Sequence, residues 1–266
     1  MYELQQEAFY KVKPLLDGGY LHPEILSIIE GNNPGWIFAD QSAQPRSALV
    51  WSKGIQGFYL IGDHTNQEFI NTLDGFISSS IAPRMRELSL DHFEVSGHHN
   101  NWDMGSIFAS RNLHQFEQMV FKLFHKPFVS SAKGLKIINL KLDEWENQEL
   151  INLEFLKEHI HLFWSTKDDF LQRGYGFAAV EGLEIIGLSY SSFVSEDTHA
   201  IGIETLPHYQ NKGVGTHLAT LLVEDILTNS FTPYWDCSLD NKASKKLAQR
   251  LGFQQVHQYK CNSFSV

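Results

Sequence analysis

One short stretch, residues 203–216, constrains the fold of this 266-residue chain more than any other. It reads Ile-Glu-Thr-Leu-Pro-His-Tyr-Gln-Asn-Lys-Gly-Val-Gly-Thr. The apolar run 200–206 is typical of a strand, and Pro207 cannot extend a strand ladder because it has no N–H. Apolar residues then recur at helix spacing, namely Leu218, Leu221, Leu222 and Ile226. The stretch therefore predicts a strand that passes through a glycine-bearing turn into a helix.

The glycine turn has the properties of an anion site. Gly213 and Gly215 permit unusual backbone angles and place no Cβ between the backbone and a ligand. The first N–H groups of a helix have no intrahelical partner, and the helix dipole makes that end positive. No Lys-Ser/Thr pair follows Gly215, and the Rossmann spacing is absent, so two common nucleotide motifs are excluded. A tight turn without a ligand remains the alternative.

The order of elements predicts a mixed α/β fold. In the C-terminal half we expect helices at residues 152–164 and 242–251, besides the helix that follows the glycine turn. The predicted strands there are 135–142, 177–180, 185–190, 200–206, 234–239 and an extended segment from Phe253. In the N-terminal half we expect strands at 36–39, 48–51, 57–61 and 93–95, a helix containing Phe69, and a helix at 114–123.

The polar stretch 129–136 is the best candidate for a domain boundary. It predicts an N-terminal α/β domain at residues 1–130 and a second domain at 131–266.

A second motif follows the first in order, Asn-x-Ala-x-x-x-Leu-x-x-x-Leu-Gly-Phe at residues 241–253. Together the two motifs resemble those of the GCN5-related N-acetyltransferase (GNAT) superfamily, over residues 135–266. Gly-Ile-Glu-Thr at 202–205 and Trp-Asp-Cys at 235–237 are similar to the subgroup that includes zwittermicin A acetyltransferase. The resemblance implies a GNAT-like acyl-CoA N-acyltransferase domain at the C-terminal end. The smaller domain before it would lie on the substrate side or be a degenerate GNAT-like copy.

The resemblance implies acetyl-CoA as co-substrate. Its pantetheine arm would lie along the backbone of Ile203, Glu204 and Thr205. Asn241 matches an asparagine that contacts this arm, and Ser244 lies one helical turn further on. The diphosphate would bind the amides of the glycine turn, formed by Gln210, Asn211, Lys212, Gly213, Val214, Gly215 and Thr216.

The catalytic groups are less constrained. His199 and Glu204 are equal candidates for the base that accepts the amine proton, and Asp236 could hold the substrate ammonium. A backbone N–H near Leu206 is the expected donor to the oxyanion. Ala248 stands where many relatives have a tyrosine that protonates the leaving thiolate. We expect transfer of acetyl to a primary amine of a small molecule by direct attack in a ternary complex; a non-catalytic CoA-binding sensor or interaction module is the alternative.

The composition of the chain argues against several classes of binding partner. The chain has 21 Lys and Arg against 31 Asp and Glu, a net charge of −10, which argues against nucleic acid or an anionic membrane as the main partner. The basic helix face of Lys242, Lys245, Lys246 and Arg250 is by default solvated, with the 3′-phosphate of CoA as the alternative. No metal is expected, since the spacing of His92, His98, His99 and Asp103 fits no ligand pattern. Two cysteines and the lack of a signal pattern predict a cytoplasmic protein; the oligomeric state stays open.

Overall fold

The computed structural model describes residues 1–125 and 135–266, and these residues form two compact units. The first unit comprises residues 1–118 and 258–266, and the second comprises residues 119–257. The predicted boundary between residues 130 and 131 lies outside the described residues. Each unit also contains strand residues from the far side of that boundary, so a division into 1–130 and 131–266 does not describe the units.

The first unit is built on a mixed sheet with the strand order β1-β2-β3-β4-β5-β12. Strands β2 to β4 are a meander of antiparallel neighbours, and β5 then pairs with β4 in parallel. The last strand, β12, pairs with β5 antiparallel, with Phe264 opposite Phe93. The strands are β1 (Tyr2–Glu3), β2 (Gly35–Ala39), β3 (Ser47–Ser52), β4 (Gly57–Gly62), β5 (His92–Gly97) and β12 (Phe253–Ser265).

The helices of the first unit cover its sheet and exclude water from an aromatic core. A long helical segment follows β4, in which α2 continues through the π-helical turn η2 into α3. Its apolar side packs on the sheet, where Phe69, Phe93 and Phe108 are fully buried. The helical elements are η1 (Gln6–Leu16), α1 (Pro23–Ile29), α2 (Gln67–Phe76), η2 (Ile77–Ile81), α3 (Ala82–Glu87) and α4 (Met104–Ile107).

The segment His114–Leu123 forms strand β6, so the helix predicted there is wrong. Met119, Val120 and Phe121 are consecutive buried residues, and a short apolar run of this kind is compatible with either structure. Tertiary pairing decided the outcome, because β6 lies between β12 and β11.

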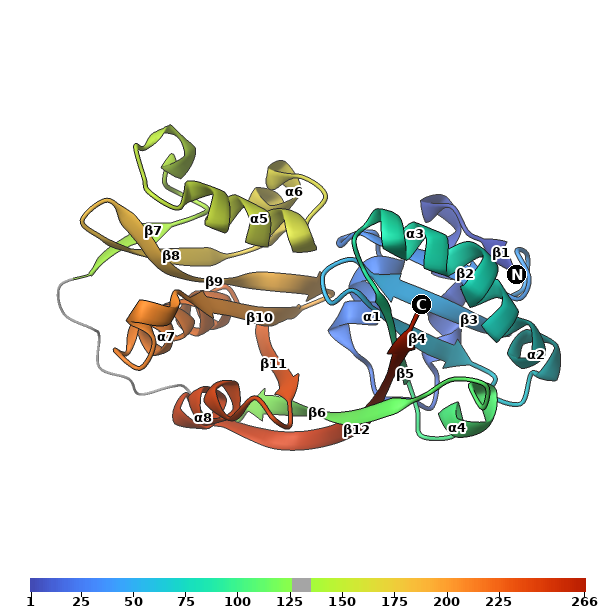
Figure 1. The fold of residues 1–266 in the computed structure, drawn as a ribbon. Coiled ribbons are helices and arrows are strands. Elements are labelled where there is room, and N and C mark those ends of the chain that lie inside the picture. Colours follow the sequence, from blue (N-terminus) through green and yellow to red (C-terminus); the bar gives the residue numbers. More distant parts are fainter. Residues whose placement is uncertain (126–134) are drawn as a thin grey trace. The chain divides into compact units, whose positions relative to one another are not determined.

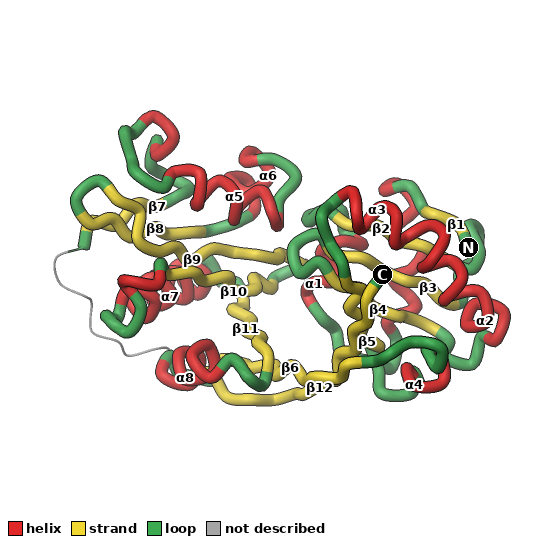
Figure 2. The backbone as a smooth tube through the Cα atoms, viewed as in Figure 1, coloured by secondary structure: helices red, strands yellow, loops and turns green. Residues whose placement is uncertain are grey.

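The second unit has a mixed sheet in the order β12-β6-β11-β10-β9-β8-β7. Helices α5 and α6 cover one face, and α7 and α8 cover the other, as Figures 1 and 2 show. This arrangement confirms the predicted mixed α/β fold. Its further elements are β7 (Lys136–Asn139), η3 (Trp145–Asn147), α5 (Leu153–Phe163), α6 (Lys167–Arg173), β8 (Gly176–Glu181), β9 (Glu184–Ser195), β10 (Thr198–Thr205), η4 (Pro207–Tyr209), α7 (Val214–Thr228), β11 (Thr232–Ser238) and α8 (Lys242–Arg250).

The same order of elements occurs twice along the chain. In the first unit a meander β2-β3-β4 is followed by α2, the parallel strand β5, helix α4 and strand β6. In the second unit the meander β8-β9-β10 is followed by α7, the parallel strand β11, helix α8 and strand β12. The repetition agrees with a duplicated fold. In each copy the last strand pairs within the sheet of the other unit.

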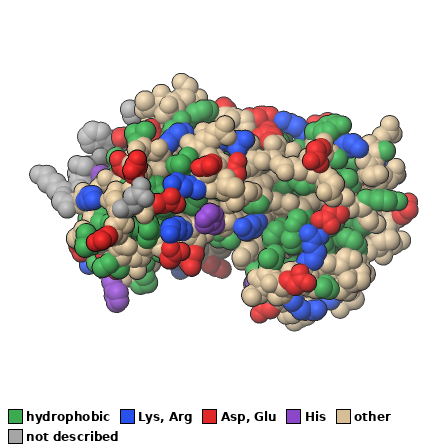
Figure 3. Space-filling view, turned by 90° about the horizontal axis from the view of Figure 1, so that it is seen from above, with side chains coloured by type: hydrophobic (Ala, Val, Ile, Leu, Met, Phe, Trp, Pro, Cys, Tyr) green, Lys and Arg blue, Asp and Glu red, His purple; other side chains and the backbone are tan. Residues whose placement is uncertain are grey.

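The surface carries mixed charges. Figure 3 shows acidic and basic side chains interspersed over the face that it presents. Among the described residues, no helix is both long and apolar enough to cross a membrane.

Candidate active site

Strands β10 and β11 of the second unit lie together at one end and separate at the other. Only residues 198–200 of β10 pair in parallel with residues 232–234 of β11. Beyond this point β10 stays paired with β9 as far as Thr205, opposite Gly187, whereas β11 runs away from it (Figure 1). The divergence leaves one edge of β10 without a strand neighbour.

Backbone groups along this edge can bind an extended ligand. The N–H of Leu206 donates to the carbonyl of Ile186 at 3.0 Å, toward β9. In an antiparallel ladder alternate residues point to the same neighbour, so the N–H and C=O groups of Ile203 and Thr205 point toward the gap. The N–H of Leu206 itself is already engaged with β9, so a backbone donor to the oxyanion has to come from a neighbouring residue whose N–H points toward the gap, such as Ile203.

The glycine turn closes one end of the gap and starts helix α7. Gly213 has a φ of 85°, a left-handed conformation that favours glycine. A Cβ on Gly215 would lie 3.2 Å from Thr205 Oγ1 and 3.3 Å from Ile203 Cδ1, so the absence of a side chain lets α7 begin close to β10. The amide of Gln210 donates to the carbonyl of Thr205 at 3.2 Å and ties the turn to the strand end.

Tyr209 is also anchored in this turn. Its hydroxyl donates to Glu184 Oε2 at 3.1 Å, and this bond is the main reason that the pKa of Tyr209 rises to about 12. The Lys212 ammonium lies 4.8 Å from the centre of the Tyr209 ring. The turn is thus held by side-chain contacts on both sides.

A cavity of about 490 Å³ lies between the end of β10, the glycine turn and helix α8. Most of the residues predicted to bind the co-substrate line it. Three do not: the side chain of Lys212 packs on Tyr209, Val214 is buried in the core, and Leu206 is outside the lining. The predicted residues that line the cavity are Ile203, Glu204, Thr205, Gln210, Asn211, Gly213, Gly215, Thr216, Asn241 and Ser244.

Helix α8 presents its first turn to the same cavity. Asn241 caps the helix, because its Oδ1 accepts the N–H of Ser244 at 3.0 Å. The cap uses the oxygen of the amide and leaves its NH₂ group as a donor. The Ser244 hydroxyl accepts the indole N–H of Trp235 at 3.0 Å, which fixes its position on the cavity wall.

Two basic residues on this wall were expected by default to be solvated. Lys246 and Arg250 line the cavity, together with Leu247. Neither cation forms an ion pair with any residue in the described part of the chain. Their spacing of four along α8 was the only signal in the sequence, and that spacing is equally typical of a solvent-facing helix side.

His199 lies outside the cavity, in the part of β10 that is still paired with β11. The side chain is buried, and its Nδ1 lies 3.0 Å from the hydroxyl of Ser191. The rings of Tyr175 and Phe231 pack against it at 5.3 and 4.7 Å. Burial lowers the pKa of His199 to about 4. The environment is that of a neutral core histidine.

The two candidate carboxylates lie on the sheet face opposite α7 and α8. Trp235 and Cys237 of β11 belong to the core beneath these helices, so Asp236 between them faces the other way. Glu204 follows the same alternation relative to Ile203 and Thr205, and its carboxylate contributes to raising the pKa of buried Tyr190. The diverging strands therefore place one carboxylate on each side of the gap.

Ala248 and Cys237 are core residues. Ala248 is fully buried in the cluster that includes Trp235 and Leu251. Burial raises the pKa of the Cys237 thiol, which argues against a nucleophilic thiolate. The residues with hydroxyl groups in the cavity lining are Thr205, Tyr209, Thr216 and Ser244.

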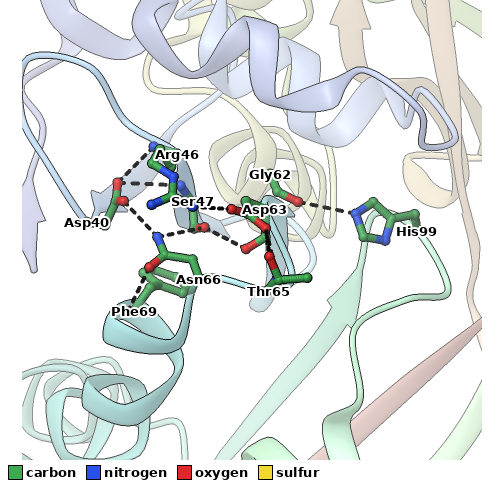
Figure 4. Close-up of polar contacts among 9 residues, drawn as sticks. All are labelled: Asp40, Arg46, Ser47, Gly62, Asp63, Thr65, Asn66, Phe69 and His99. Carbon is green, nitrogen blue, oxygen red and sulfur yellow. Dashed lines mark hydrogen bonds and ion pairs between the residues drawn. The ribbon is translucent and has the colours of Figure 1, made fainter.

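The first unit has a different turn between β4 and α2, shown in Figure 4. Asp63 accepts hydrogen bonds from the hydroxyl and N–H of Thr65 and pairs with Arg46, and these bonds lower its pKa to about 2. Asn66 caps α2 by accepting a first-turn N–H at 3.3 Å and donates to Asp40 at 2.8 Å. Side chains thus occupy the amides of this turn, and two carboxylates would repel a phosphate. Among the described residues, no side chain occupies the amides of the glycine turn in the second unit in this way.

Within residues 1–125 and 135–266, no group of three or more His, Cys, Asp or Glu residues is placed to hold a metal ion.

Comparison with known proteins agrees with this geometry. A relative from Bacillus subtilis strain 168, described as the uncharacterized N-acetyltransferase YdfB, is 25% identical over 262 residues, which cover 97% of this chain and 96% of the relative. The crystal structure of a GCN5-related N-acetyltransferase-like protein from Streptococcus suis 89/1591 aligns with a TM-score of 0.67 at 18% identity, over 97% of this chain and 98% of that one. A tandem GNAT protein from the clavulanic acid biosynthesis pathway aligns with a TM-score of 0.61 at 11% identity, over 99% and 97% of the two chains. The family model for GNAT acetyltransferases matches residues 14–262, so this chain belongs to the GNAT acetyltransferase family.

Proposed function

We propose that the protein transfers an acetyl group from acetyl-CoA to a primary amine of a small molecule, by direct attack in a ternary complex. The observation that carries this proposal is the gap between β10 and β11, with the open glycine turn at its end. Membership of the acetyltransferase family supports the same reaction class.

The residues around the cavity fit the parts of acetyl-CoA. The Ile203 carbonyl and the Thr205 N–H can pair with the amides of the pantetheine arm, as a strand would. The amides that begin α7 suit the diphosphate, and Lys246 and Arg250 supply cations for the phosphates. A Cβ at Gly215 would narrow this space.

The carboxylates supply the proton chemistry. Acetyl-CoA provides an activated carbonyl with a thiolate as leaving group. Glu204 would accept the proton that the attacking amine loses, either directly or through a water molecule. Asp236, on the facing strand, would hold the incoming ammonium. The N–H of Ile203 would donate to the carbonyl oxygen as negative charge develops on it.

Thermal unfolding with and without acetyl-CoA tests the donor site. At about 100 times the dissociation constant, the ligand should stabilise the folded protein by about 2.7 kcal/mol. For a chain of this length we expect the Tm to rise by about 5–10 °C. Gly215→Glu should abolish the shift, because the new carboxylate fills the cavity and repels the diphosphate.

Gly75→Glu is the matched control, because Gly75 is exposed on α2 with no atom near its Cβ position. This variant should keep the full shift. A folded Gly215→Glu protein with unchanged affinity would refute the site.

Thiol release from acetyl-CoA, measured with a panel of amines, separates catalysis from binding. Turnover with any amine supports the enzyme, and binding without turnover supports the sensor or interaction module.

A further inference from the structure

The first unit has a cavity of its own, larger than the one in the second unit. Its volume is about 760 Å³, within the range of small-molecule sites. The end of β5, the start of β6 and the middle of β12 line it on one side, and the loop that follows β5 lines it on the other. Residues used below from its lining are Gly97, His99, Trp102, Glu117, Lys260 and Asn262.

Three features hold the loop after β5 in place. His99 Nε2 lies 3.2 Å from the carbonyl of Gly62 (Figure 4). Asp103 caps α4 by accepting the N–H and hydroxyl of Ser106. A Cβ on Gly97 would lie 2.7 Å from the Trp102 ring, so glycine is needed for the loop to fold back over the strand. The cavity wall is therefore preformed.

Asn262 is the first group in this cavity that indicates a ligand. The residue is only 5% exposed, yet its side-chain amide makes no hydrogen bond with any described residue. Its backbone pairs with Val95, whose side chain is fully buried. Buried polar side chains usually have a hydrogen-bond partner, and this amide has none in the described part of the chain, so it is available to a ligand in the cavity. The indole N–H of Trp102, which is also buried, has no acceptor among the described residues.

Glu117 and Lys260 are the second indication. Glu117 is half-buried on β6, and Lys260 is exposed on the neighbouring strand β12. They line the same cavity, but neither forms an ion pair with the other or with any described residue. Two opposite charges that do not neutralise each other suit a ligand that carries both an ammonium and a carboxylate.

We propose that this cavity binds a small zwitterionic molecule with the size and chemistry of a free amino acid or a dipeptide. Glu117 binds its ammonium, Lys260 binds its carboxylate, and the Asn262 amide hydrogen-bonds the part between them. The side-chain-filled turn of the first unit argues against CoA as the occupant. The proposal does not depend on the reaction proposed for the second unit.

Binding is tested on the full-length protein without acetyl-CoA. The probes are the standard L-amino acids and their glycyl dipeptides, screened by ligand-observed NMR and measured by isothermal titration calorimetry. For a probe that binds, the N-acetyl derivative lacks the ammonium and the carboxamide lacks the carboxylate. Each derivative should bind at least about tenfold more weakly. Glu117→Gln and Lys260→Gln should weaken the parent probe to a similar extent, whereas Glu87→Gln and Lys122→Gln, which change exposed residues outside the cavity, should not.

Asn262→Leu separates a binding role from a structural one. Because the amide has no partner in the protein, this change should leave the Tm unchanged or raise it while binding falls at least about tenfold. A lowered Tm with binding retained would identify Asn262 as a structural residue and overturn the proposal. Failure of every probe to bind, or binding that survives in all three cavity variants, would also overturn it.

Mass spectrometry after addition of acetyl-CoA identifies the source of the ligand. A bound probe that gains one acetyl group is the acceptor, and one that stays unchanged is an effector; both outcomes support the cavity. If amines are acetylated with KM values that the three cavity variants do not alter, and no probe binds in calorimetry, the cavity proposal fails while the proposed function stands.

Discussion

In the cavity between β10, the glycine turn and α8, neighbouring residues have different structural roles. Gly213 is needed for its backbone angle and Gly215 for the space that its missing side chain leaves. Glu204 lies on β10 where its edge is free, with its backbone at the cavity and its carboxylate on the opposite sheet face, whereas His199, on the same strand, lies in the aromatic core. Position relative to the point where β10 and β11 separate decides which ionisable group can act on a substrate.

The rate of catalysis distinguishes these two residues. Glu204→Gln should lower kcat by about 10²–10⁴, because the group that accepts the amine proton is lost. His199→Gln should leave kcat nearly unchanged, because its side chain lies in the aromatic core outside the cavity. Steady-state kinetics of the two variants measure both effects, and a large loss in His199→Gln with Glu204→Gln unaffected would reverse the assignment.

His199→Gln has a separate effect on stability. The pKa of His199 is about 4 in the folded protein, against 6.5 for a free side chain. The unfolded chain therefore binds a proton more readily, and wild-type stability falls as the pH drops from about 6.5 to about 4. Urea unfolding across this range should show a shallower dependence in His199→Gln.

At the scale of elements, the site depends on where strands part and where helices begin. Strand β10 provides a free edge only beyond Ala200, since β11 covers it before that point. Helices α7 and α8 both start at the cavity, so their first-turn N–H groups and cap residues gather there. We therefore expect a cap residue in this place to stabilise the helix and also to bind the ligand.

Asn241 allows these two functions to be measured separately. Asn241→Ala should lower the free energy of unfolding by about 1 kcal/mol, because the N-cap is lost. It should also weaken acetyl-CoA binding. Asn241→Asp keeps a capping oxygen but replaces the NH₂ donor, so stability should be retained while affinity falls. Urea melts and calorimetry measure the two effects, and full affinity in the aspartate variant would exclude a ligand contact.

At the scale of the whole chain, each unit is completed by a strand from the other half of the sequence. Residues 261–265 of β12 pair with β5 and bring Phe264 into the core of the first unit. Phe264 packs on Phe93 and Phe108, with ring centres 5.1 and 5.2 Å away. The C-terminal end therefore stabilises residues that lie far from it in sequence.

This arrangement predicts a distant effect of Phe264→Ala. Truncation of the ring should lower the free energy of unfolding of the first unit by about 3–5 kcal/mol. Hydrogen exchange measured by mass spectrometry should show faster exchange in β4 and β5. Ser265→Ala, an exposed change on the same strand, is the control. A fragment of residues 1–125 should lack a cooperative transition, and such a transition at the Tm of the full chain would contradict the prediction.

Prediction from sequence succeeded where local pattern and final environment agree. Three predicted strands lie within β2, β3 and β4, namely 36–39, 48–51 and 57–61. The helix predicted at 152–164 is one residue longer than α5 at each end. It failed at His114–Leu123, where an apolar run fits either structure and pairing with β11 and β12 selected the strand. Lys246 and Arg250 were assigned to solvent because helix spacing does not show what faces a helix.

The sequence by itself determined the strand, turn and helix around Gly213 and Gly215, because those preferences act between residues that are close along the chain. It also indicated the order of elements, and through its two motifs the family. Only the tertiary structure decided that β10 and β11 separate after Ala200, that Leu206 is engaged with Ile186, and that β12 completes the first unit. These features depend on pairing between segments distant in sequence, and no local preference specifies which strand edge finds which partner.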